Sequence, residues 1–257
     1  AAAALVLALL VAAFSLALPG ILSRDYDARS LSALRQQAAR ARQDFARILG
    51  SLAARKDPFE NRALPAEPGD FFPLFREAGL DLENQGIALC DGDGFIEAWH
   101  GNILSPADQI GRNDLEELKR TGATFLARSI ATVYLAVLQP LGTGTRMLVH
   151  FERLAFIPQV QSSYIREFHA LGPALRSNAE IRYYDLNEDV AGWEAFFARH
   201  DDEYTGQPRE EHEIQTLVFP LRNEEGRIMA DVTLRSPSLT SRLTAAGEDL
   251  RRISLLA

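Results

Sequence analysis

Residues 31–52 have the sequence LSALRQQAARARQDFARILGSL, in which apolar residues recur at alternating steps of three and four. These positions are Leu31, Leu34, Ala38, Ala41, Phe45, Ile48 and Leu52. The spacing is a heptad repeat, and the polar residues between them keep the stripe narrow, which favours a seam between two helices. We therefore predict a stalk helix over residues 23–57 that pairs with a second copy of the chain. The alternative is an amphipathic helix that lies along its own domain.

The segment before this helix, residues 1–22, contains no charged side chain. About 20 mostly apolar residues in a helix are enough to cross a bilayer core, so we predict a transmembrane anchor here. A cleaved signal peptide is the alternative, although such peptides begin with a basic region and have a shorter apolar core.

A second heptad pattern occupies the other end of the chain, within residues 238–257. Its apolar positions are Leu239, Leu243, Ala246, Leu250 and Ile253. Ser236-Pro237-Ser238 precedes the pattern and is typical of a helix start. We predict a C-terminal helix that leads toward a second membrane span. In a dimer, the first and last helices would form a four-helix stalk able to transmit a small displacement.

Between the two helices we predict an α+β body of two tandem modules with antiparallel sheets. The first module covers residues 58–157, since Asp57-Pro58 ends the stalk helix. Its strongest signal is the acidic Gly turn Asp91–Gly94 between two apolar stretches, which predicts a hairpin. The expected elements are a short helical segment from Phe71, strands at 85–90 and 95–100, a helix at 106–120, and strands at 125–138 and 146–151.

The second, smaller module covers residues 158–237. We expect helices at 164–175 and 193–199, a strand at 179–186, and a hairpin of strands at 216–221 and 227–234. Residues 91–96 (DGDGFI) and 223–228 (NEEGRI) both place an acidic turn ending in Gly before an Ile-containing strand. This local repeat is compatible with two related modules.

This order of elements resembles the double Cache sensor regions of histidine kinases and chemoreceptors, which have a PAS-like fold. Residues 218–228 (VFPLRNEEGRI) also resemble a stretch of bacterial sensor histidine kinases. The resemblance implies a periplasmic sensor region held in the bacterial inner membrane, with the first module distal to the membrane. Alternatives are a membrane-anchored binding or assembly protein without signalling output, and a secreted enzyme.

Other chemistry has little support in the sequence. A net charge of -8 argues against nucleic-acid binding, and no catalytic motif is recognisable. The Asp91 turn does not fit a calcium loop, because the twelfth position is Asn102. Charged loops at 200–203 and 210–213 contain His and carboxylates, but such runs are more often solvated than metal-binding. The lone Cys90 lies in an apolar stretch and is expected in the core. We predict no catalytic residue, metal or cofactor.

A small-molecule ligand of the first module would lie between its sheet and the covering helices. Polar or aromatic residues on or beside the expected strands are the candidates for contact: Trp99, His100, Arg128, Tyr134, Arg146 and His150. Such groups orient a ligand within apolar walls, and an arginine can bind a carboxylate through two hydrogen bonds. The alternative is that the aromatic residues pack in the core and the arginines face water.

Overall fold

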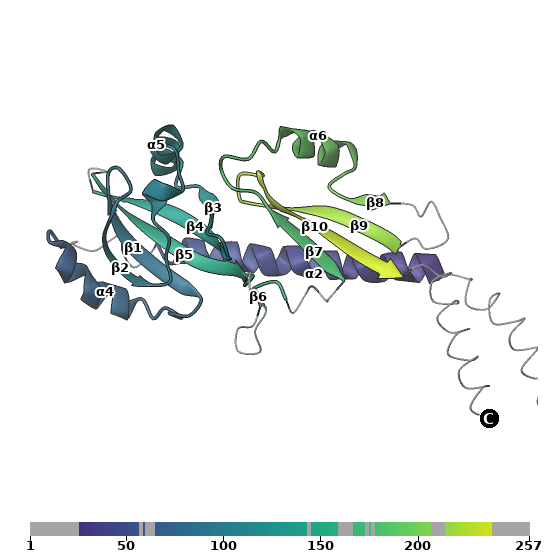
Figure 1. The fold of residues 1–257 in the computed structure, drawn as a ribbon, viewed down its shortest axis with the longest axis horizontal. Coiled ribbons are helices and arrows are strands. Elements are labelled where there is room, and N and C mark those ends of the chain that lie inside the picture. Colours follow the sequence, from purple (N-terminus) through teal and green to yellow (C-terminus); the bar gives the residue numbers. More distant parts are fainter. Residues whose placement is uncertain are drawn as a thin grey trace, which may run out of the picture.

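A computed structural model of the chain describes residues 26–56, 59, 65–142, 145–158, 167–172, 175, 178–206 and 214–237. Over these residues the protein is α+β, with one long helix running along two antiparallel sheets (Figure 1). Within them, no helix has the length and apolar character needed to span a membrane. The predicted anchor at 1–22 and the predicted helix at 238–257 lie outside the described residues.

The long helix is α2 (Tyr26–Ala54), and its apolar stripe is covered by the chain itself. Five members of the predicted stripe are buried, and they form one apolar cluster with Leu49 and residues of both sheets: Leu34, Ala38, Ala41, Phe45 and Leu52. The other two, Leu31 and Ile48, are partly buried against this cluster. The structure therefore shows the alternative interpretation, in which an amphipathic helix lies along its own domain. The predicted homodimer remains a prediction and requires another face of the helix.

The first sheet has the strand order β2-β1-β5-β4-β3, with β6 paired to β5. Its strands are β1 (Gln85–Asp91), β2 (Ile96–Gly101), β3 (Thr124–Arg128), β4 (Thr132–Leu141), β5 (Arg146–Phe156) and β6 (Phe168–His169). One face packs against α4 (Phe71–Glu77) and the C-terminal part of α2. The other face packs against α5 (Arg112–Thr121), which follows a short 3-10 turn, η2 (Pro106–Asp108).

The second sheet has the order β7-β10-β9-β8 and lies between α2 and a short helix (Figure 1). Its strands are β7 (Ala179–Tyr183), β8 (Tyr204–Gly206), β9 (Ile214–Arg222) and β10 (Ile228–Pro237). The covering helix is α6 (Ala191–Arg199), whose Phe197 is buried against Tyr184 and Ile228. The helix predicted at 193–199 and the hairpin predicted at 216–221 and 227–234 are confirmed.

Both modules contain the same tight turn, which confirms the local repeat seen in the sequence. Asp91 Oδ1 accepts hydrogen bonds from the backbone N–H groups of Asp93 (3.0 Å) and Phe95 (2.9 Å). Asn223 Oδ1 accepts the equivalent bonds from Glu225 (3.2 Å) and Arg227 (2.9 Å). The turns end at Gly94 (φ 89°) and Gly226 (φ 84°), a backbone conformation that favours glycine.

Three predicted elements differ from the structure. The strand expected over 125–138 is divided into β3 and β4 by a turn, in which Ser129 N–H donates to the carbonyl of Thr132 (2.8 Å). The helix expected at 164–175 is wrong at Phe168 and His169, because their backbone pairs with β5 as strand β6. The helix expected at 106–120 is interrupted, since α5 begins only after Gly111. Strand β8 was not predicted.

Replacing the aromatic centre of the α2 stripe tests the packing of the helix. Phe45 is 2% exposed, so Phe45→Ala leaves a cavity and is expected to lower the free energy of unfolding by about 3–5 kcal/mol. Gln43→Ala, on the exposed face of the same helix, is the control and should change it by less than about 0.5 kcal/mol. Urea unfolding measures both, and equal effects would contradict the packing described here.

Candidate functional site

The six predicted ligand residues divide between the two faces and the ends of the first sheet. Trp99 and Tyr134 lie on the α5 face of the sheet. Trp99 pairs with Ala88, and Ala88 belongs to the same apolar cluster as Tyr134. Trp99 is 55% exposed, whereas Tyr134 is buried and packs edge-on against Phe151 at 6.0 Å. Burial raises the pKa of the Tyr134 hydroxyl. Tyr134 thus lies within the core, and Trp99 lies at an open edge strand.

The two histidines lie on the opposite face. His100 pairs with Ile87, a core residue of the α4 side. His150 is 1% exposed, and its Nε2 lies 3.1 Å from Gln139 Oε1. Burial, aided by the charges of Arg55 and Lys56, lowers the pKa of His150 to about 3. This histidine is therefore neutral at physiological pH.

The two arginines lie at strand ends and are engaged. Arg146 Nε is 2.7 Å from a carboxylate oxygen of Glu97. Arg128 Nη1 donates to the carbonyl of Tyr183 (3.5 Å) and lies 3.9 Å from Glu188, so it connects the first sheet to the second module. The structure does not bring the six residues together in one site, and their contact with a ligand remains a prediction.

The junction between the modules is polar. Asn223 Nδ2, at the tip of the β9–β10 hairpin, donates to the carbonyl of Thr124 (3.3 Å). Thr124 Oγ1 in turn donates to Glu224 Oε2 (3.2 Å). The repeated turn of the second module thus contacts the start of β3 in the first module.

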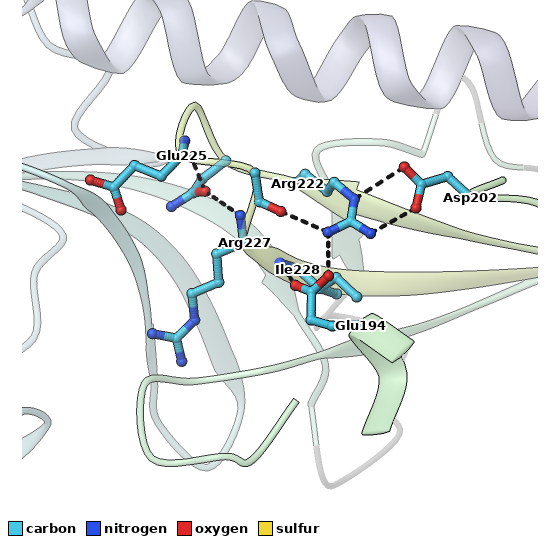
Figure 2. A network of polar contacts seen from close by, with 8 residues as sticks. Glu194, Asp202, Arg222, Glu225, Arg227 and Ile228 are labelled. Carbon is cyan, nitrogen blue, oxygen red and sulfur yellow. Dashed lines mark hydrogen bonds and ion pairs between the residues drawn. The ribbon is translucent and has the colours of Figure 1, made fainter. Parts of the chain in front are cut away.

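A network centred on Arg222 fastens α6 to this hairpin (Figure 2). Arg222 binds the Asp202 carboxylate through two hydrogen bonds (2.7 and 3.2 Å) and donates to Glu194 Oε2 (2.6 Å). The other oxygen of Glu194 accepts the backbone N–H of Ile228 (3.0 Å). Arg222 also donates to the carbonyl of Gly226 (2.7 Å). Sequence reasoning missed this network, because its members are separated along the chain.

The same network extends to α2. The carbonyl of Asp202 accepts a hydrogen bond from Arg42 Nη2 (2.7 Å), and Arg35 Nε lies 2.5 Å from Glu203. Asp201 and Asp202 have φ values of 51° and 58°, in the left-handed region that costs free energy for residues other than glycine. The loop after α6 is thus held in an uncommon conformation by arginines from α2 and β9.

Two features of the sequence have a plain structural role. Cys90 is buried, as predicted, and burial raises the pKa of its thiol to about 12, which makes it unreactive. Within the described ranges no group of three or more His, Cys, Asp or Glu residues is arranged to hold a metal ion. The charged segment 210–213 lies outside those ranges.

Comparisons with known proteins find likeness only among solved structures. No family model matches the chain, and no curated protein matches it. An extracellular ligand-binding receptor from Desulfohalobium retbaense DSM5692 is 16% identical with a TM-score of 0.46, over 81% of this chain and 40% of that one. The chain thus spans well under half of that receptor.

Two further structures are covered almost completely by the chain. A protein named methyl-accepting chemotaxis protein X is 9% identical with a TM-score of 0.48, over 84% of this chain and 100% of that one. The extracellular domain of a protein described as a histidine kinase is 11% identical with a TM-score of 0.47, over 88% and 96%.

The buried His150 predicts a pH dependence of stability. Its pKa is about 3 in the folded chain and 6.5 ordinarily, so between these values the unfolded state binds a proton that the folded state does not. The free energy of unfolding therefore does not depend on His150 above pH 6.5. As the pH falls from 6.5 toward 3, protonation of the unfolded state lowers it by up to about 1.4 kcal/mol per pH unit. Unfolding free energies from pH 7 to 4 should fall less steeply for His150→Gln. If the pH dependence of unfolding is the same for His150→Gln and the unmodified chain, His150 is not its source. The control is His200→Gln, because His200 is partly exposed.

Proposed function

We propose that this chain is the extracytoplasmic sensor region of a bacterial transmembrane signalling protein, a two-component histidine kinase held in the inner membrane. The proposal rests on one observation. Ser30 Oγ, near the start of α2, donates to Ser236 Oγ, near the end of β10, at 2.7 Å. The chain therefore enters and leaves the described body at one end of the molecule (Figure 1), as a receptor connected twice to a membrane requires.

The helix α2 is also attached to both modules. At its C-terminal end, Arg55 forms an ion pair with Glu152 on β5, and both side chains are mostly buried, at 14% and 16% exposed. Along its length, α2 packs on β4 and β5 of the first sheet and on β9 and β10 of the second. Closely packed interfaces change between discrete arrangements, so a ligand in either module would shift this helix as a unit.

In this proposal the first module is distal to the membrane. It lies at the far end of α2 from the Ser30–Ser236 contact (Figure 1). A ligand bound there would act through the helix and through the polar junction at Thr124. The second module lies between this input and the two connections to the membrane.

A disulfide across the Ser30–Ser236 contact tests the mechanical role. In the full-length protein in membranes, Ser30→Cys with Ser236→Cys should form a disulfide on oxidation, which fixes α2 to β10. We expect autophosphorylation to change severalfold between the reduced and oxidised forms, because the contact lies on the proposed path.

The single variants Ser30→Cys and Ser236→Cys are the controls, because neither can form this internal disulfide and their activity should not respond to oxidation. Kinase activity that does not respond to locking at Ser30 would count against transmission through this contact. Full-length protein without autophosphorylation would overturn the assignment as a histidine kinase.

We also propose that a second copy of the chain packs on the exposed face of α2. Small or uncharged residues recur on that face at alternating steps of four and three: Ser32, Gln36, Ala39, Gln43, Ala46, Gly50 and Ala53. This heptad spacing fits a helix partner, and two helices entering one membrane would run parallel. Arg40 and Arg47 border the stripe, so like-charge repulsion should make the pairing salt-dependent.

Cysteine cross-linking in membranes tests the dimer. Ala39→Cys and Ala46→Cys lie on the exposed face and should give disulfide-linked dimers on mild oxidation. Ala41→Cys, which is buried against the sheets, should not. The native Cys90 is buried and should not interfere. Equal cross-linking at all three positions, or at none, would exclude this face as the contact.

A further inference from the structure

A cavity of about 590 Å³ lies where α2, α5 and β4 end next to one another. This volume is within the range of small-ligand sites. Three cations line it, Lys56, Lys119 and Arg120, and none of the described residues that line it is an Asp or Glu. Phe59 and Leu141 add apolar surface. The charge of this lining is opposite to that of the whole chain, which is -8.

Two of the cations are held in place by backbone carbonyl groups. Lys56 Nζ donates to the carbonyl of Gly122 (3.0 Å). Lys119 Nζ donates to the carbonyl of Gly92 and to Glu116 Oε1 (2.6 Å), and its side chain is only 12% exposed. An ammonium group has three donors, and these contacts account for two of those of Lys119. The positive charges are thus ordered before any ligand arrives.

These contacts have a structural role as well, because Lys119 and Arg120 occupy the last turn of α5, where cations interact favourably with the helix dipole. That role does not account for Arg120. Its side chain is exposed, and among the described residues it has no hydrogen bond or ion pair. A guanidinium group at the edge of a cavity with two fixed ammonium groups is suited to a bidentate bond with an oxyanion.

The wall behind the cations is also polar. Gln139, on β4, is 5% exposed; its Nε2 donates to the carbonyl of Lys56 (3.0 Å), and its Oε1 contacts His150. A buried amide and imidazole in an apolar sheet are costly unless they are hydrogen-bonded, and this pair satisfies part of that need. The positive charges of Arg55 and Lys56 also lower the pKa of His150, because they disfavour a further positive charge on its ring.

We infer that this cavity binds a small oxyanion that carries two or more negative charges. Its Arg120 would bind the anion directly, and Lys56 and Lys119 would stabilise it from fixed positions. Phe59 and Leu141 would contact an organic part of the ligand. The inference adds a ligand class to the proposed sensor and depends on that proposal only for its biological meaning, because binding is measured without any signalling output.

Titration calorimetry on the full chain at pH 7 tests the inference, with citrate and inorganic phosphate as probes and sodium chloride of matched ionic strength as the blank. We expect saturable binding of at least one probe, with a rise in melting temperature that follows its concentration. Arg120→Gln should weaken that binding about tenfold, the effect of losing a charge-assisted hydrogen bond. The exposed position of Arg120 leaves the fold intact.

Arg199→Gln is the matched control, because Arg199 is also an exposed residue in the last turn of a helix, α6, which covers the second sheet and does not line the cavity. It should leave the dissociation constant unchanged. Absence of saturable binding by both probes would overturn the inference, as would equal weakening by Arg120→Gln and Arg199→Gln. Binding that is retained while signalling fails would overturn the proposed function but not the site.

Discussion

The fold depends on the burial of one helix stripe against two sheets at once. Six residues of α2, from Leu34 to Leu52, lie in a single apolar cluster with residues of β4 in the first sheet and β9 in the second. Each large apolar side chain buried in this way contributes about 1.5–3 kcal/mol. Both sheets pack on this one stripe, so the helix joins the two modules and fixes their relative position.

Polar contacts make this shared support specific. Buried apolar surface is not directional, whereas hydrogen bonds and ion pairs require a defined geometry. Arg55 sets the position of α2 on the first sheet, and Arg42 ties it to the loop after α6. Arg222 connects that loop to the β9–β10 hairpin, whose Asn223 reaches Thr124. One continuous set of contacts therefore runs from the helix through the second module and back to the first.

The two ends of the molecule differ in chemistry, as the proposed sensor role requires. The cationic cavity lies at the C-terminal end of α2, among loops and helix ends that leave room for a ligand. The Ser30–Ser236 contact at the other end joins the points where the chain enters and leaves the body. The packed stripe of α2 connects these ends.

Local sequence by itself determined the long helix, the two hairpins and their matching turns, because heptad spacing and Asp/Asn-to-Gly turns act over a few residues. It also placed Cys90 in the core. Only the tertiary structure decided what covers the α2 stripe, since apolarity predicts burial but not the partner. Pairing with β5 made Phe168 and His169 a strand. The distribution of Tyr134 and His150 over opposite faces, and the meeting of Arg222 with Asp202 and Glu194, likewise depend on contacts between residues distant in sequence, which no local pattern encodes.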